Sequence, residues 1–382
     1  MNPRFKNLVC SKCSREYPID KPLNLCSCGG PLLVPLQTDA PNGNIEDIIS
    51  EDDSLWRYRN FLPLEESANI VSLGEGFTPL FRADELGTAL GMGELYLKDE
   101  GVNPTGSFKD RGMTVAITRA KELGISKVSL PSAGNAGVSA AAYAKEAGME
   151  CRVFIPEDTP SSFAEATQNF GAQLTMIKGT IADAGKAMKE ELDESWFDLS
   201  TLKEPYRIEG KKTMGYELAE QMDWSLPDVI VYPTGGGTGL IGMWKAFEEL
   251  EQLGWIDSFR PKMVSVQSEG CAPIVKAFEE GKEYADRWVN AETKAYGLRV
   301  PSAVGDFLIL KAIRESDGIA VSVSEEQINE GVGYIKEHTE LNPAPEGGAA
   351  LIAVKKLKNN GYFSGDEKVL VFITGNGEKY ES

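Results

Sequence analysis

Short apolar runs alternate with helical segments from about residue 93 onward, and this alternation restricts the fold more than any other feature. It predicts helices at 108–123, 138–147 and 240–253, and strands at 95–97, 128–130, 151–155, 229–232, 263–266 and 369–373. Repeated strand–helix units form parallel sheets that are covered by helices. The sequence therefore predicts an α/β protein.

Length and charge exclude several classes of protein. At about 150 residues per domain, 382 residues suggest two to three domains. The net charge of −19 repels phosphate backbones, so nucleic acid is not an expected partner. We find neither the roughly 18 unbroken apolar residues of a membrane span nor an apolar signal sequence at the N-terminus. A cytoplasmic protein without membrane contact is expected.

Histidine is nearly absent from the chain. His338 is the only one, so every mechanism that needs two histidines is excluded. A serine or cysteine nucleophile would depend on this one residue, which has no nucleophile motif nearby. The chemistry must therefore come from carboxylates, a lysine, a metal or a bound cofactor.

Four cysteines near the N-terminus have the spacing of a metal site. Cys10 and Cys13 form a Cys-x-x-Cys pair, and Cys26 and Cys28 follow in Cys-x-Cys-Gly-Gly. This spacing predicts a structural zinc ribbon over residues 1–35, because four thiolates close a tetrahedron and leave no open position. Two disulfides are the alternative, which the absence of a secretion signal disfavours. A linker is expected at about 31–53.

One predicted strand is followed by a lysine at the start of a helix. In the segment NPTGSFKDRGM, Ser107 can cap a helix that begins close to Lys109. The positive end of the helix dipole and partial burial would lower the pKa of this lysine, as a Schiff-base lysine requires. The alternative is an ordinary surface lysine.

Three further loops follow predicted strands, where ligands bind in parallel sheets. The loop SAGNAG covers 132–137, and ITGNGEKY covers 373–380. In PTGGGTGLIG, residues 233–242, glycines expose backbone amides at a helix N-terminus and predict an anion site. This last loop fits neither the dinucleotide fingerprint nor the P-loop.

Taken together, these loops resemble the pyridoxal-phosphate enzymes of the tryptophan-synthase β-subunit type, and within that group the threonine synthases. The resemblance begins at Gly-Glu-Gly-Phe-Thr-Pro-Leu, residues 74–80, and runs to the C-terminus. It implies two open, mostly parallel sheet domains with helices on both faces. The larger domain would comprise 36–95 and 205–382, and the smaller one, 96–204, would be inserted into it.

The same resemblance assigns roles to individual residues. Lys109 would bind pyridoxal 5'-phosphate covalently, Asn135 would contact its 3-hydroxyl, and Thr374 would face its pyridine nitrogen. Thr78 and Ser107 would bind the substrate. The cofactor's phosphate would lie on Gly235, Gly236, Gly237, Thr238 and Gly239.

A substrate phosphate would have its own arginine. The segment PYRIEGKKT, residues 205–213, is similar to Asn-Pro-Tyr-Arg-x-Glu-Gly-x-Lys-Thr in threonine synthases, with Glu204 in place of the asparagine. Arg207 is the candidate phosphate clamp, because a guanidinium can make two parallel bonds to phosphate. Alternatively, Arg207 forms an ion pair with Glu204 or Glu209 and only holds the segment.

The resemblance implies a lyase that converts O-phospho-L-homoserine and water to L-threonine and phosphate, acting on a small amino-acid substrate as a homodimer. Alternatives are an ammonia-lyase for threonine or serine and a β-replacement synthase such as cysteate synthase. The loop GGGTG is closer to threonine ammonia-lyases and cysteine synthases than to many threonine synthases. A non-catalytic relic with a partner-binding ribbon is a third hypothesis.

Overall fold

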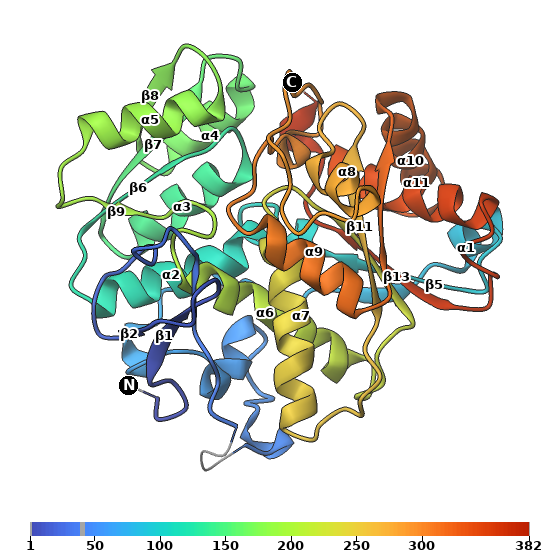
Figure 1. Ribbon diagram of the computed structural model, residues 1–382, viewed down its shortest axis with the longest axis horizontal. Helices are drawn as coiled ribbons and strands as arrows, with labels where there is room; N and C mark the ends of the chain where they lie inside the picture. Colours follow the sequence, from blue (N-terminus) through green and yellow to red (C-terminus); the bar gives the residue numbers. More distant parts are fainter. Residues whose placement is uncertain (1, 39–42, 382) are drawn as a thin grey trace.

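A six-stranded sheet forms the centre of the larger half of the molecule (Figure 1). The computed structural model describes residues 2–38 and 43–381. The strand order is β12-β11-β10-β13-β5-β4, and all neighbours are parallel except β4 and β5. The strands are β4 (Leu80–Arg82), β5 (Glu94–Asp99), β10 (Val229–Pro233), β11 (Lys262–Ser268), β12 (Ile319–Val323) and β13 (Lys368–Ile373).

Helices cover both faces of this sheet, because alternate strand residues point to opposite sides. In β10, Val231 packs into the core beneath α1 (Asp84–Leu90), α10 (Glu325–His338) and α11 (Pro345–Asn359). Its neighbour Tyr232 packs on the other side. The helices there are α6 (Tyr206–Gln221), α7 (Thr238–Gln252), α8 (Pro273–Glu279) and α9 (Asp306–Glu315).

The smaller half is a four-stranded parallel sheet of order β8-β7-β6-β9, at the upper left of Figure 1. Its strands are β6 (Lys127–Pro131), β7 (Glu150–Pro156), β8 (Gln173–Ile177) and β9 (Phe197–Asp198). Apolar residues of α2 and α3 pack on β6 and β7, and α5 packs beside Phe154. The helices are α2 (Lys109–Glu122), α3 (Asn135–Glu146), α4 (Ser161–Asn169) and α5 (Ile181–Glu191).

The N-terminal residues form a small antiparallel sheet, β2-β1-β3, at the lower left of Figure 1. Its strands are β1 (Asn7–Cys10), β2 (Glu16–Pro18) and β3 (Leu32–Leu33). Phe5 and Leu8 belong to the same apolar core as α6 and α7, so the ribbon is packed onto the molecule and not appended to it. The predicted linker contains β3 and the short helix η1 (Ile45–Asp47); its residues 39–42 lie outside the described residues.

The predicted α/β class with parallel sheets is confirmed, and each predicted strand and helix is present with shifted ends. The helix expected at 138–147 begins three residues earlier, at Asn135. Strand β5 extends to Asp99 within the larger sheet, beyond the expected domain boundary at residue 95. Among the residues described, no helix is both long and apolar enough to cross a membrane.

A buried cluster of charges joins β5, α2 and α6. Arg111 of α2 bonds Glu100 through Nε and Glu217 of α6 through Nη1, both at 2.7 Å. Lys98 of β5 also pairs with Glu217 and donates to the carbonyl of Thr78 at 2.6 Å. The four charged side chains are 0% exposed. Burial alone raises the pKa of Glu217, but Arg111 and Lys98 outweigh it and bring the pKa to about 2.

Helices α2 and α6 cross at a pair of glycines. A Cβ on Gly210 would lie 1.7 Å from the carbonyl oxygen of Arg111, and a Cβ on Gly112 would lie 3.0 Å from that of Arg207. Real Cβ atoms do not approach backbone so closely, so only glycine fits at Gly210. The crossing brings the first turns of the two helices together.

Candidate active site

The start of α2 is bound to the end of β13. Ser107 pairs with Gly375 by an isolated bridge, and the N–H of Phe108 donates to the carbonyl of Thr374 at 3.0 Å. Asn135, the first residue of α3, lies against the same turn: a Cβ on Gly375 would be 3.6 Å from its Nδ2. Three loops that are far apart in the sequence thus meet beyond the strand ends, where ligands bind in such sheets.

Lys109 is the first residue of α2, as expected. The helix N-cap is Phe108 and not Ser107, which corrects the predicted cap by one residue; the Ser107 hydroxyl accepts from the N–H of Lys109 at 3.3 Å. Burial lowers the pKa of Lys109 to about 8, helped by the charge of Arg207 and opposed by Glu346. The amine is therefore far more nucleophilic near neutral pH than that of an ordinary lysine.

The glycine loop 235–239 follows β10 and opens α7, and all its predicted residues lie in this one turn. Gly237 has φ +80°, and a Cβ on it would lie 2.3 Å from Ile309. A Cβ on Gly239 would lie 2.0 Å from the hydroxyl of Tyr232. The first amides of α7 have no partner within the helix and sit at its positive end, so the turn can hold an anion.

Several buried polar atoms near these loops have no hydrogen-bond partner among the residues that the structure describes. They include Oδ1 of Asn135, Oδ1 of Asn376, Nε of Arg207 and the hydroxyl oxygen of Tyr232. A buried polar atom without a partner costs about 1–3 kcal/mol, so such atoms are rare unless a ligand or water serves them. Asn135 and Arg207 are both predicted site residues, and the orphaned atoms support a ligand between the loops.

The other two predicted site residues, Thr374 and Thr78, differ in whether their hydroxyl groups already have hydrogen-bond partners. The Thr374 hydroxyl, at the end of β13, makes no hydrogen bond to another described residue. Thr78 is occupied in the charge cluster: its hydroxyl donates to Glu100 at 2.8 Å and accepts from Arg111 at 3.2 Å. Thr78 therefore belongs to the buried charge cluster that holds α2 in place. The contact of Thr78 with a substrate stays a prediction.

Arg207, the second residue of α6, is buried. Its Nη1 donates to the carbonyl of Leu199 at 2.7 Å and to the hydroxyl of Thr201 at 3.3 Å. The alternative ion pairs do not form: Glu204 accepts backbone N–H groups of α6 at 3.0 and 2.7 Å, and Glu209 pairs with two lysines. Burial lowers the pKa of Arg207 to about 10, so it remains a cation at neutral pH.

Lys211, one helical turn after Arg207, was missed by the sequence analysis. It is fully buried, donates to the carbonyl of Phe108, and has its Nζ 4.0 Å from the centre of the Phe108 ring. Burial lowers its pKa well below the ordinary value, and the charges of Lys109 and Arg207 lower it further. We call Lys109, Arg207 and Lys211 the cation trio. Position 211 is variable in the motif, so only its i, i+4 spacing from Arg207 could have indicated it.

No carboxylate neutralises the cation trio directly. Within residues 2–38 and 43–381, none of the three side chains lies within 4.0 Å of a carboxylate oxygen. The acid that acts on Lys109 is Glu346 at the start of α11, which was also missed; its Oε1 accepts from the N–H of Gly297 at 2.6 Å and from the hydroxyl of Tyr380 at 3.0 Å. The Arg207 cation, two further basic side chains and the free amides of α7 favour an anionic ligand.

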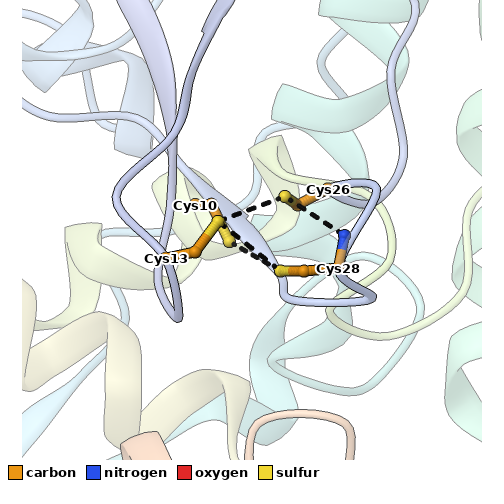
Figure 2. Close-up of side chains that lie close together, drawn as sticks. All are labelled: Cys10, Cys13, Cys26 and Cys28. Atoms are coloured by element: carbon orange, nitrogen blue, oxygen red, sulfur yellow. Dashed lines mark hydrogen bonds between the residues drawn. The ribbon is translucent and has the colours of Figure 1, made fainter.

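The four N-terminal thiols converge as predicted (Figure 2). All four sulfur atoms lie within 4.8 Å of one another, and the Cys10–Cys28 and Cys13–Cys26 separations are 3.5 and 3.6 Å. A tetrahedral zinc with Zn–S bonds of about 2.3 Å holds its sulfurs about 3.8 Å apart. The cysteines form no disulfides, so the geometry fits a tetrahedral metal site and contradicts the disulfide alternative.

Comparison with known proteins gives a consistent result. A family model described as "Pyridoxal-phosphate dependent enzyme" matches residues 71–375. Threonine synthase of Methanocaldococcus jannaschii is 37% identical over 377 residues, 97% of this chain and 92% of that protein. Threonine synthase of Methanosarcina acetivorans is 37% identical over 97% of this chain and 91% of its own. Maize serine racemase superposes with a TM-score of 0.68 at 22% identity, over 78% of this chain and 88% of its own, which shows a shared fold.

The lowered pKa of Lys109 predicts a distinctive reactivity. In protein freed of bound carbonyl compounds, reductive methylation of Lys109 should rise with pH to a midpoint at about 8, because the neutral amine is the reacting species. Peptide mass spectrometry measures each lysine separately. The exposed lysines, with midpoints near 10, serve as internal controls. A midpoint near 10 at Lys109 would contradict the assigned environment.

Proposed function

The chain belongs to the pyridoxal-phosphate dependent enzymes and, within that family, to the threonine synthases, and we propose that it converts O-phospho-L-homoserine and water to L-threonine and phosphate. The family expected from the sequence is thus confirmed. The choice of substrate is supported by the environment of Arg207. This buried cation lies beside Lys109, has no carboxylate partner among the described residues, and has an unbonded Nε.

The residues of the site fit pyridoxal phosphate. We propose that Lys109 binds it covalently, that the glycine loop holds its phosphate, and that Asn135 and Thr374 contact its ring. When bound, this cofactor withdraws electrons from the α-carbon of an amino acid. The orphaned Oδ1 of Asn135 and the unbonded hydroxyl of Thr374 support these contacts. Thr374 is a neutral group, so it cannot hold a ring nitrogen protonated as a carboxylate would.

Lys109 is also the proposed proton carrier. Its Nζ has a pKa of about 8, near enough to neutral pH to accept a proton and return it. Such transfers are needed at several substrate carbons when phosphate leaves one carbon and water adds to the next. No histidine lies in the site; His338 ends α10, where its Nδ1 is 3.0 Å from the carbonyl oxygen of Tyr334.

The substrate distinguishes this proposal from its alternatives. Ammonia-lyases act on threonine or serine, which carry no second anion, and a β-replacement synthase needs a second substrate. We propose that Arg207, with Lys211 one helical turn away, takes the substrate's phosphate. Glu204 does not oppose this: it caps α6 through two backbone N–H groups.

A parallel substrate screen tests the proposed function. Phosphate release from phosphohomoserine is expected, without ammonia or 2-oxobutanoate from threonine. Arg207→Lys should raise KM for phosphohomoserine about 10- to 150-fold, because a buried two-bond contact worth roughly 1.5–3 kcal/mol is lost. A phosphate-free amino acid bound by the enzyme should keep its affinity in this variant. If wild-type enzyme releases no phosphate, or if Arg207→Lys weakens both ligands equally, the proposal is wrong.

We propose that the four cysteines bind one structural zinc ion. All four positions would be filled by sulfur, so the metal would have no open site for catalysis. Elemental analysis of protein purified without chelator should give about one zinc per chain, and Cys13→Ser with Cys28→Ser should abolish it. Protein that is fully active and folded yet free of metal would contradict this assignment.

The expectations for cellular location and for binding partners follow from the enzyme class. We propose a cytoplasmic enzyme that acts on a small amino-acid substrate without nucleic acid. The homodimer stays a prediction.

A further inference from the structure

The loop between β2 and β3 of the ribbon contacts one particular part of the active-site half. The carbonyl of Ile19 accepts hydrogen bonds from the hydroxyl of Tyr206 at 3.1 Å and from Arg119 at 3.3 Å. The Nδ2 of Asn24 donates to the carbonyls of Asp198 at 2.7 Å and Lys203 at 3.4 Å. Three of these four hydrogen bonds fall on residues 198–206, which we call the brace segment.

The brace segment in turn holds Arg207. It leads from β9 into α6, and the Arg207 guanidinium donates to Leu199 and Thr201 within it. Thr201 also lies against the glycine loop, since a Cβ on Gly236 would be 2.8 Å from its methyl carbon. A displacement of the brace segment would therefore move the arginine.

The cysteine cluster fixes the loop that makes these contacts. Cys26 and Cys28 lie in the same loop as Ile19 and Asn24, and their sulfurs face those of the Cys10–Cys13 turn (Figure 2). The strands on either side are only three and two residues long, so few backbone hydrogen bonds hold the loop. Joining the four thiols removes conformational freedom from it.

We infer that the ribbon is a positioning element for the anion-binding end of the active site, acting through Tyr206 and Asn24 on the brace segment. The inference rests on the proposed function for the identity of the anion. A ribbon that only stabilises the fold would affect cofactor binding, kcat and KM alike. A positioning ribbon affects the affinity for the anionic ligand.

Conservative variants of the two contacts test this in the cofactor-loaded, metal-loaded enzyme. Tyr206→Phe keeps the ring beside Arg119 and removes the hydroxyl, with its bond to Ile19 and its interaction with Arg119. Asn24→Ala removes the other contact. Each should raise KM for phosphohomoserine, and the inhibition constant of inorganic phosphate, about fivefold. The visible absorbance of the cofactor and kcat should change less than twofold. Asn7→Ala, which loses a bond inside the ribbon, is the control and should change neither constant.

Hydrogen exchange supplies a readout that does not depend on turnover. Removing the metal with a chelator should speed amide exchange in the brace segment at least tenfold, while the six-stranded sheet stays protected. Unchanged exchange there, or a fall in kcat equal to the rise in KM in both variants, would overturn the inference. If wild type does not turn over phosphohomoserine, the proposed function fails, but brace-segment exchange and phosphate affinity still decide the role of the ribbon.

Discussion

The position of the active site depends on one buried guanidinium. Arg111 lies between Glu100 and Glu217 and thereby ties α2 to the end of β5 and to α6. Removing one partner from such a network costs about 3–5 kcal/mol, because a charge is left buried without compensation. The glycine crossing at Gly210 allows the two helices to approach closely enough for this network. Lys109 and Arg207 stand at the first turns of the helices joined in this way.

The cation trio differs from this network because its side chains are not paired with carboxylates of the described residues. The other fully buried cations of the described α2–α6 region pair with carboxylates, as Lys98, Arg111 and Lys212 show. Among the described residues, the trio contacts two backbone carbonyls, one hydroxyl and the ring of Phe108. A bound anion would compensate these charges, so anionic ligands should stabilise the folded state by mass action. The same arrangement that costs stability in the free protein would provide affinity for a phosphate.

Motifs within one loop could be predicted from the sequence, and contacts between distant elements could not. Lys109, Asn135 and the glycine loop sit at strand–helix turns whose residues signal their own conformation. Lys211 gains its role only when α6 packs against α2, and Glu346 only when the fold brings the start of α11 close enough for its charge to act on Lys109. Local patterns specify neither arrangement. Glu204, which stands where the motif has asparagine, accepts two backbone N–H groups at the start of α6, a role that the motif does not indicate. Of the helices, only α2, α3 and α7 were predicted, and α1, α4, α5, α6, α8, α9, α10 and α11 were missed.

The most direct test of this account is the dissociation constant of pyridoxal phosphate for Arg111→Lys. Lysine keeps the positive charge but cannot bond both Glu100 and Glu217 with the planar geometry of arginine. If the buried network positions Lys109 and the phosphate turn, the dissociation constant should rise at least about tenfold while the far-ultraviolet circular dichroism stays unchanged. An unchanged dissociation constant in a folded Arg111→Lys protein would show that the site forms without this network.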